Sequence, residues 1–582
     1  MPPLRLDRVR LGVQLVLLGC AVLLWARVQE PLWLDEAWTV EDLLGARTLH
    51  VGVQVRELVY EQLVRLWLLL FGLSQLSVRA LPGLCGLGAL WITARAARRS
   101  GGDPFTAVMV LGSIPLAVHF WSELNRYGPL MLLAAAGSGA LLEAGRRPSP
   151  RAWATAGLTG ALAFFIHHTA AFTVLLVQAA VLLAQRQAAP LAERRARTLA
   201  LLAIPAAQLA LLGLEVPRLL ERARLYRAEH TDVYAHVYSG PTPAAALEAL
   251  RQWSPGREAG APGVALGAGL LLALVVAGAL RPGRGRTELL LLSGGPALGA
   301  ALGSLAQPMF LGRVLLPAAP ALALLCARAW PTRPRLRRGL AWAALALGWW
   351  SAAAAPWPED PRGALDLIAA AGPRPGEGLV VQPPFARTTL RANERLARSP
   401  LPLADLGVDA PTPLQAARWP WSHFPARVFV VLQDFRGFDR PLVHELPLHF
   451  ARVRSLGRVT AFEVLLCEQP LAPADALARA DLPGDPPALR AFRRGSVLLH
   501  AGRAGPALEA FRAARQALQG APSADPRQAR DDAGQAAWAV AWSAHQAGRP
   551  EEAREALREA EALGTAPPWA RATIGGGPPA PR

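Results

Sequence analysis

The stretch LGVQLVLLGCAVLLWAR, residues 11–27, decides the fold class, because it is a long apolar run preceded by three arginines. A helix of about 20 apolar residues crosses the hydrocarbon core of a lipid bilayer. The run leads into the acidic residues Glu30, Asp35 and Glu36 with no small-residue cleavage site. It is therefore typical of a retained membrane anchor and not of a cleaved signal peptide.

Composition extends this interpretation to the first half of the chain. A formal net charge of +18 with 52% hydrophobic residues is ordinary for a polytopic membrane protein with basic loops, and it does not indicate nucleic-acid binding. Membrane lipids are then the immediate partners of the chain. No Lys is present, so any bound phosphate must be held by Arg, His or backbone N–H groups. We expect a polytopic α-helical fold with about eleven spans, at residues 11–27, 78–97, 105–121, 128–144, 152–167, 169–185, 198–216, 262–280, 287–306, 311–329 and 340–355.

The segment RELVYEQLVRLWLLLFG, residues 56–72, is apolar enough for a further span, so the distribution of Arg must decide. If it crosses the membrane, the loop RAARRS lies outside and every later basic loop inverts with it. If it lies along the interface, the loops GRRPSPR, QRQAAPLAERRAR, RPGRGR and PTRPRLRR share the side of the N-terminus, as the positive-inside rule requires. We therefore predict a multi-pass protein of the plasma (inner) membrane, with a cytoplasmic N-terminus and an extracytoplasmic region after Pro356.

Under this topology, unusual polar side chains collect near the outer face of the membrane. Ionisable groups at such depth are costly unless they face a wet pocket or one another, so their concentration on one side is a functional hypothesis. We expect them to line one cavity at the outer leaflet: Asp35, Glu36, Arg56, Arg79, Glu123, Arg126, Tyr127, His167, His168 and Arg313.

Several motifs resemble those of one family, in the same order. LWLDEAWTV resembles the first-loop motif of membrane-embedded C-type glycosyltransferases, the protein-O-mannosyltransferase and lipid A aminoarabinose-transferase superfamily, which uses polyprenyl-phosphate sugars. LWLLLFGLSQLSVRALPGLCGL, SELNRYGPL, FFIHHTA and FLGRVLLPAAPALALL follow. After the last span, PEDPRGALDLIAAAGPRPGEGLVV resembles the entry to the extracytoplasmic domain of bacterial members, so the resemblance covers most of residues 1–470.

Two motifs depart from the family pattern. Relatives carry a His-Pro-Pro or Lys-Pro-Pro element before the LFG block; here the basic position falls on Arg56, with Glu57 and Leu58 in place of the prolines. In SELNRYGPL, relatives place Arg two residues after the Glu, whereas this chain has Asn125 there and Arg126 next. Whether Arg126 inherits the role is open.

The resemblance implies a glycosyltransferase, hexosyl or pentosyl, with a polyprenyl-phosphate sugar as donor. A carboxylate suits deprotonation of an acceptor hydroxyl, and guanidinium groups suit the negative charge that builds on the departing phosphate. Asp35 would be the base, Glu36 its neighbour or a substrate partner, and the displacement would invert the anomeric centre. The motifs do not encode the acceptor, which would be a glycan, a lipid or a protein. The lipid phosphate would be held by Arg56 and Arg313, with Arg79 and Arg126 as further candidates.

The same residues also have structural interpretations. Asp35 and Glu36 fit a solvated helix N-terminus, and arginines at span ends fit snorkelling side chains. The chemistry requires no cofactor. A divalent metal stays open because of His167 and His168, yet adjacent histidines project in different directions on a helix, and no third ligand stands out.

Beyond Pro356 the chain changes character. GLVVQPP, RVFVVLQDF and FEVLLCEQP predict strands and PRGALDLIAAA predicts a helix, so a transmembrane domain over 1–356 would be followed by an α/β domain over 357–470. AGRAGPALEAFRAARQAL and AGRPEEAREALREAEAL echo each other, with Ala507 matching Ala553, which indicates tetratricopeptide-like helices or a plain helical hairpin over 486–566. Two repeats are fewer than the roughly three that a solenoid needs, so we expect these helices to pack on the neighbouring domain or on a protein partner. Residues 567–582 are predicted to be a disordered tail.

Two other classes of function stay open. A secondary transporter would share the span count, but it favours charged or broken segments near mid-bilayer in two corresponding halves, and no such symmetry is visible. A non-catalytic membrane scaffold that acts through its C-terminal helices would need neither the acidic pair nor the outer arginines.

Overall fold

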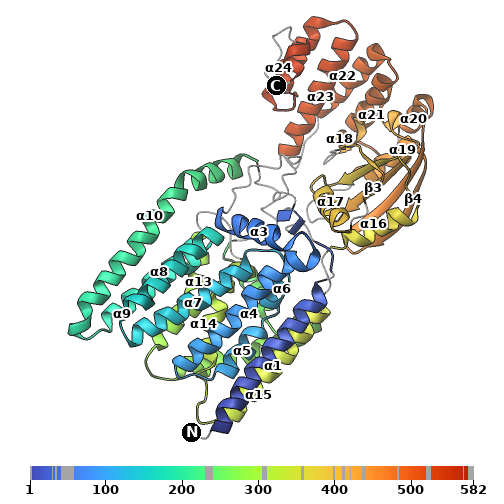
Figure 1. Cartoon of the computed structure of the whole chain (residues 1–582). Helices are drawn as coiled ribbons and strands as arrows, with labels where there is room; N and C mark the ends of the chain where they lie inside the picture. The colour runs from blue at the N-terminus through green and yellow to red at the C-terminus, as the bar shows by residue number, and fades with distance from the viewer. Residues whose placement is uncertain are drawn as a thin grey trace. The chain divides into compact units, whose positions relative to one another are not determined.

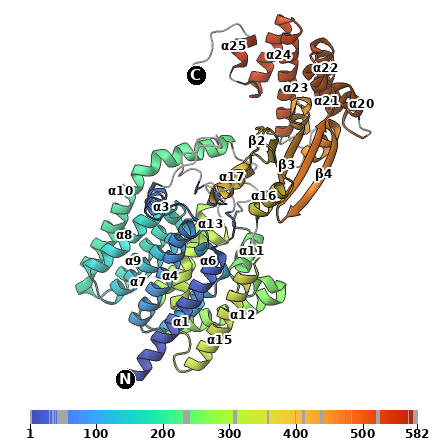
Figure 2. The ribbon, with the colours of Figure 1, turned by 45° about the vertical axis from the view of Figure 1, so that its right-hand side comes forward.

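The computed structural model describes residues 3–28, 30–32, 36–37, 39–40, 58–229, 240–304, 311–355, 359–397, 400–408, 413–419, 421–434, 441–481, 484–519, 526–567 and 569–574. The chain forms two compact units. The first, called the membrane unit here, comprises Met1–Glu30 and Trp38–Trp357; the second, the C-terminal unit, comprises Pro31–Ala37 and Pro358–Arg582. Figures 1 and 2 show the elements of each unit.

The membrane unit is helical throughout its described residues. Its elements are α1 (Pro3–Arg27), α3 (Leu58–Phe71), α4 (Gln75–Arg99), α5 (Pro104–Gly112), α6 (Pro115–Trp121), α7 (Tyr127–Arg146), α8 (Pro150–Ile166), η1 (Ala171–Leu175), α9 (Leu176–Gln187), α10 (Leu191–Glu229), α11 (Pro243–Trp253), η2 (Arg257–Ala259), α12 (Gly260–Leu280), α13 (Arg286–Gly303), η3 (Gly312–Ala318), α14 (Ala319–Cys326) and α15 (Pro334–Ala354).

Several of these helices can cross a bilayer. In the described part of the chain, 5 helices are long and apolar enough, or 6 if the bent pair α5 and α6 counts as one span. The chain is therefore a multi-pass membrane protein, while the expected number of about eleven spans stays a prediction. One expected span needs correction: residues 105–121 are two helices bent by 77°. The break precedes Pro115, whose ring lacks an N–H and clashes with the preceding turn.

Helix α3 supports the prediction that its segment lies along the interface. The structure describes 14 residues of it, Leu58–Phe71. Tyr60 and Val64 are buried, whereas Leu66 and Leu69 are exposed. One face thus packs on the protein, and an apolar face is left for lipid.

The arginine-rich loops meet at one end of the membrane unit. Arg146, the last residue of α7, donates to the carbonyl groups of Arg99, the last residue of α4, and of Ser100, which follows it. The N–H of Asp103 donates to the carbonyl of Ala327, after α14, at 3.0 Å. The N-terminal half of α1 lies at this end too, because Gly12 packs against Phe105 near the start of α5. These loops therefore share a side with the N-terminal part of α1, as the topology predicted; which compartment that side faces stays a prediction.

The C-terminal unit contains a five-stranded mixed sheet in the order β2-β1-β3-β5-β4. The predicted strands are present as β1 (Gly378–Gln382), β3 (Arg427–Gln433) and β5 (Phe462–Pro470), and sequence analysis missed β2 (Ala404–Asp405) and β4 (Phe450–Val459). β1 is parallel to β2 and β3, whereas β5 is antiparallel to β3 and β4.

Helices cover both faces of this sheet. Because side chains alternate along a strand, Phe429 and Val431 of β3 pack against α16 (Pro361–Ala370) and α17 (Ala386–Ala397), while Val428 and Val430 pack against α18 (Pro413–Ala417) and α19 (Pro441–His449). The other short elements of this region are η4 (Trp421–His423) and α20 (Pro473–Arg479).

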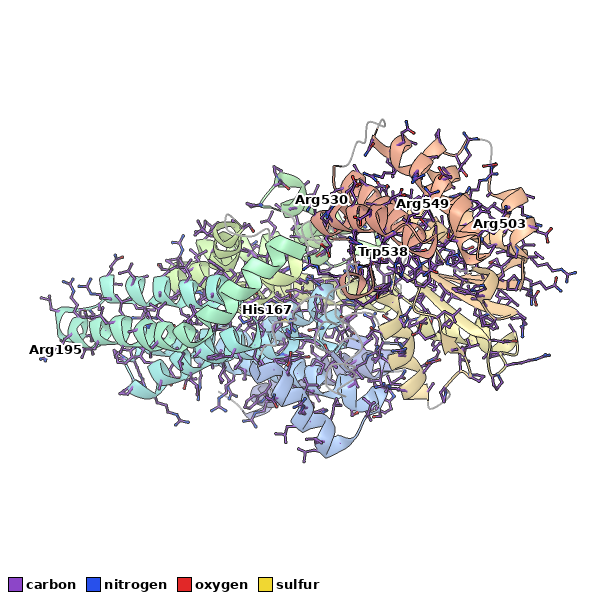
Figure 3. The ribbon with its side chains drawn as sticks, turned by 90° about the horizontal axis from the view of Figure 1, so that it is seen from above. His167, Arg195, Arg503, Arg530, Trp538 and Arg549 are labelled. Carbon is purple, nitrogen blue, oxygen red and sulfur yellow. The ribbon has the colours of Figure 1, made fainter. Side chains whose placement is uncertain are left out.

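The remaining helices form hairpins that pack on the α/β part. They are α21 (Pro487–His500), α22 (Ala504–Gln519), α23 (Pro526–Gln546), α24 (Pro550–Ala562) and α25 (Ala570–Ile574). The turns before α22 and α24 are equivalent: Gly502 and Gly548 have φ of 73° and 72°, and Arg503 and Arg549 follow them (Figure 3). Leu414 of α18 joins the core of these helices, so they do pack on the neighbouring domain.

Two expectations for this region have different outcomes. Whether the hairpins are tetratricopeptide repeats stays a prediction. The disordered tail was expected from residue 567, yet residues 570–574 form α25, because Ala570 and Ile574 find an apolar core to pack in.

Candidate active site

Arg79, in the first turns of α4, fixes the end of α1. Its side chain is buried, and Nη1 donates to the carbonyl oxygens of Arg27, Val28 and Glu30 at 2.8, 3.2 and 2.6 Å. The last carbonyl groups of a helix have no partner inside it, and a cation there also complements the helix dipole. Arg79 therefore sets the direction in which the chain leaves α1 toward the acidic pair. Its contact with a phosphate stays a prediction.

A line of charged side chains and one histidine runs from the end of α1 to the α6–α7 turn. Arg27 Nε donates to Glu30 Oε2 at 3.1 Å, and Arg27 Nη1 lies 3.4 Å from His119 Nδ1. His119 Nε2 lies 2.7 Å from Oε1 of Glu123, whose side chain is 0% exposed. Sequence analysis proposed Glu123 and missed Arg27 and His119. Their position at the margin of apolar runs was the available signal, since a charge there needs a partner.

The turn between α6 and α7 is held by Asn125. Its Nδ2 donates to the carbonyl of Phe120 at 3.1 Å, and its Oδ1 accepts the N–H of Tyr127 at 2.8 Å. The residue that replaces the family's Arg is thus part of the turn itself. Arg126 lies over the ring of Tyr60 on α3, with its guanidinium carbon 5.9 Å from the ring centroid, a cation–π contact.

Tyr127 and His167 face each other across the ends of α7 and α8. Their ring centroids are 5.1 Å apart, and Tyr127 also contacts Phe120 at 4.8 Å. His167 Nδ1 lies 2.8 Å from the hydroxyl of Thr169, which fixes the ring at the C-terminus of α8. Figure 3 labels His167 among the helices of the membrane unit.

His168 points to another neighbour. Its ring meets Phe164 edge-on at 5.4 Å, so the two adjacent histidines do project in different directions. Among the described residues, no group of three His, Cys, Asp or Glu side chains is placed to hold a metal ion.

The predicted acidic pair is described only in part. Asp35 lies outside the described residues, as does Arg56. Glu36 is in a helical turn with Ala37, and both are 0% exposed. This segment belongs to the C-terminal unit, where the backbone of Leu32 pairs with the side chain of Asn393.

Arg313 lies in the short helix η3 and is half-buried. Trp253 Nε1 donates to the carbonyl of the preceding residue, Gly312, at 2.9 Å, which anchors this end of η3 on α11. η3 also packs against α7 and η1, the elements next to Tyr127 and His168.

The membrane unit thus gathers one part of the predicted site. Seven of the predicted side chains lie at the end of this unit opposite the arginine-rich loops: Arg79, Glu123, Arg126, Tyr127, His167, His168 and Arg313. They come from the start of α4, the turn between α6 and α7, the end of α8 and the short helix η3. Glu36 is placed with the C-terminal unit. A buried cation and a buried carboxylate with a histidine between them can bind an anion and exchange a proton.

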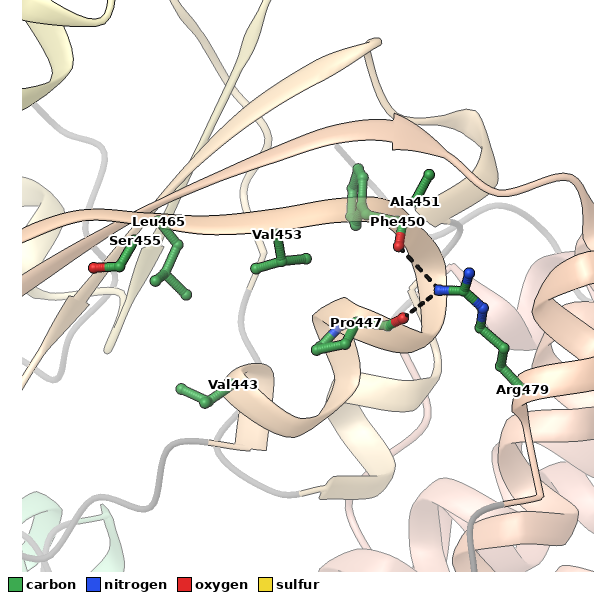
Figure 4. A pocket seen from close by; sticks show the side chains of 8 residues that line it. All are labelled: Val443, Pro447, Phe450, Ala451, Val453, Ser455, Leu465 and Arg479. Carbon is green, nitrogen blue, oxygen red and sulfur yellow. Dashed lines mark hydrogen bonds between the residues drawn. The ribbon is translucent and has the colours of Figure 1, made fainter.

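An apolar hollow lies elsewhere, in the α/β part of the C-terminal unit. It has a volume of about 330 Å³ and is lined mainly by apolar residues of α19, β4 and β5 (Figure 4). Its single ionisable lining residue, Arg479, donates to the carbonyl groups of Pro447 and Phe450 at 2.9 and 3.3 Å. This hollow holds no acid–base pair and is not a candidate for the chemistry.

Solved structures similar to this chain include ArnT from Cupriavidus metallidurans bound to undecaprenyl phosphate. It is 14% identical, with a TM-score of 0.49, over 79% of this chain and 98% of that chain. ArnT in the apo state gives a TM-score of 0.48 with the same identity and coverage. A mutant of the arabinofuranosyltransferase AftD from Mycobacteria is 14% identical, with a TM-score of 0.41, over 79% of this chain and 41% of that chain. No protein-family model and no curated protein matches the sequence.

Proposed function

We propose that this protein transfers a hexose or pentose from a polyprenyl-phosphate donor to an acceptor hydroxyl at the outer face of the plasma membrane. The observation that carries the proposal is the convergence of buried Arg79 and Glu123 with half-buried His119 where the chain leaves α1 for the acidic pair. Buried ionisable groups near a membrane surface are rare without a functional reason. In this topology the N-terminus is cytoplasmic and the C-terminal unit is extracytoplasmic.

The proposed reaction is a single displacement. The acceptor oxygen forms a bond to the anomeric carbon, and its proton passes to the carboxylate of Asp35. The bond between that carbon and the phosphate oxygen breaks, and its electron pair stays on the polyprenyl phosphate. Arg56 and Arg313 would hold this phosphate, since guanidinium groups bind phosphate oxygens with strong charge-assisted hydrogen bonds.

The position of the acidic pair fits both substrates. The donor is held at the membrane surface by its lipid tail, while the acceptor arrives from water. Only a site at the mouth of the membrane unit serves both, and the segment after α1 lies at such a mouth in the predicted topology. Glu36, fully buried, would orient this segment or the acceptor.

The decisive test is Asp35→Asn, which is nearly isosteric but cannot accept the proton. We expect transfer to be abolished, with a rate at least about 1,000-fold lower, while expression and binding of undecaprenyl phosphate stay normal. Mass spectrometry of envelope glycans in a deletion strain identifies the product, and complementation with each variant measures it. Glu36→Gln is the matched control, with a smaller expected loss. If Asp35→Asn transfers sugar at a comparable rate, Asp35 is not the base; if no transfer is found even with the unaltered protein, the transporter and scaffold alternatives remain.

A further inference from the structure

The peptide group of Leu32 is held by a side chain from far along the chain. Its N–H donates to Asn393 Oδ1 at 2.9 Å, and Asn393 Nδ2 donates back to the Leu32 carbonyl at 2.9 Å. The same Nδ2 donates to the carbonyl of Thr389, one turn earlier in α17, at 2.8 Å. Leu32 is 0% and Asn393 2% exposed, so water does not compete for these bonds.

This pairing specifies the amide side chain. An amide offers one acceptor and two donors, and all three groups are used in the right places. Asn is a poor choice for the interior of a helix, because its side chain competes for backbone hydrogen bonds. Its presence inside α17 is therefore better explained by the peptide that it binds than by helix formation.

The segment that Asn393 binds is the one that carries the acidic pair. Leu32 lies three residues before Asp35, and Glu36 and Ala37 beyond it are fully buried. Within the membrane unit, Arg79 holds the chain up to the carbonyl of Glu30. Arg79 thus holds the chain as far as Glu30, and Asn393 holds it again two residues later, at Leu32.

We propose that Asn393 is a positioning residue for the acidic segment, so that the α/β domain takes part in catalysis by orienting the base. The inference rests on the proposed function, since it assumes that Asp35 is the base. Hydrogen bonds that fix the backbone three residues from a catalytic group limit its excursions, and a misplacement of about 1 Å can cost about 100-fold in rate.

The test compares two buried amides of the same domain. Asn393→Ala removes all three hydrogen bonds, and Asn393→Asp keeps the acceptor but cannot donate to the Leu32 carbonyl. Gln433→Ala is the control: Gln433 is 3% exposed in β3 and donates to Glu359 Oε1 at 2.8 Å, so its loss also deletes a buried amide but leaves Leu32 held.

Two readouts are needed on the full-length protein in lipid nanodiscs. Hydrogen–deuterium exchange of the peptide covering residues 31–40 should speed up in Asn393→Ala and not in Gln433→Ala. Initial rates with lipid-linked sugar extracted from native membranes should show a kcat about 10- to 100-fold lower in Asn393→Ala, a smaller loss in Asn393→Asp, and an unchanged KM in both. A variant that is merely destabilised would contain a smaller fraction of active protein, and its hydrogen exchange would rise throughout the domain and not mainly at residues 31–40.

The outcomes separate the two proposals. Unchanged exchange at residues 31–40 in Asn393→Ala would show that Asn393 does not hold the segment. Faster exchange with a kcat within about twofold of Gln433→Ala would show that the contact does not position the base. If Asp35→Asn keeps its activity, the proposed base is wrong, while the exchange result still decides whether Asn393 holds Leu32.

Discussion

The two ends of the membrane unit both bury charged side chains, but they connect them differently. At the arginine-rich end, Asp103 Oδ2 accepts hydrogen bonds from Thr106, Arg337 and Arg338 at 2.8, 3.0 and 2.9 Å. Arg337 also donates to the carbonyl of Ala329 at 2.9 Å. Every charge in this cluster faces an opposite charge or dipole, so the cluster is closed and joins the starts of α5 and α15.

At the opposite end the charges form a line. Glu30, Arg27, His119 and Glu123 follow one another at 3.1, 3.4 and 2.7 Å, so the histidine stands between a guanidinium group and a carboxylate. A closed cluster holds helices together. A histidine that faces a buried carboxylate can serve in acid–base chemistry, which suits a site for group transfer.

The largest expected effect tests the closed cluster. Asp103→Ala leaves two guanidinium groups without their carboxylate, and breaking such a buried pair costs about 3–5 kcal/mol of folding free energy. Thermal unfolding in detergent should show a large loss of stability, with transfer per folded molecule nearly unchanged. Glu143→Ala is the control at the same end, because Glu143 and its partner Arg99 are 51% and 54% exposed, so their pair should be worth about 1 kcal/mol or less.

The second effect tests the line of charges. Glu123→Gln keeps the shape but removes the charge that faces His119, so we expect transfer to fall about 100-fold with little change in the unfolding temperature. Glu143→Gln, on α7 at the other end, is the control, since Glu143 is 51% exposed and paired with Arg99. If Glu123→Gln lowers the unfolding temperature as much as Asp103→Ala does and leaves the transfer rate unchanged, the charges at both ends are structural and the two ends do not differ in role.

These contacts show which features a sequence can predict. Long apolar runs indicated which segments of the membrane unit are helical, while the number of spans stays a prediction. Short apolar runs predicted β1, β3 and β5, which are the inner strands of the sheet, whereas the edge strand β4 exposes arginines such as Arg452 and Arg454 and lacks such a run.

The site was harder to predict than the helices. Glu123, Tyr127 and His167 were proposed because they stand in motifs, but the partners of Arg79 are backbone carbonyl groups, which no sequence motif indicates. The pairing of Asn393 with Leu32 joins residues 361 positions apart, and nothing local marks either of them. Such contacts depend on how α17 packs, which is a property of the whole fold.

The C-terminal unit also contains a closed cluster of charges and, close to it, a pair of histidines. Arg493 forms a closed cluster with Glu445 and Asp485, at 2.6 and 2.8 Å. Burial alone would raise the pKa of Glu445, but hydrogen bonds from His449 and Arg493 hold it below its usual value. Near this cluster, at the end of α21, His500 lies beside His423 with ring centroids 6.1 Å apart.

The smallest expected effect is a pH dependence from His500. Burial, followed by repulsion from His423, lowers the pKa of His500 from 6.5 to about 4. Between these values the unfolded chain binds a proton that the folded chain excludes, so stability is complete above pH 6.5 and falls as the pH drops toward 4. Because the ring is partly exposed, we expect only about 1 kcal/mol to be lost by pH 5. His500→Leu should flatten this slope in thermal unfolding measured from pH 7 to pH 5, whereas Asp103→Ala should lower stability at every pH in this range. An equal acid slope with and without His500 would show that another group carries it.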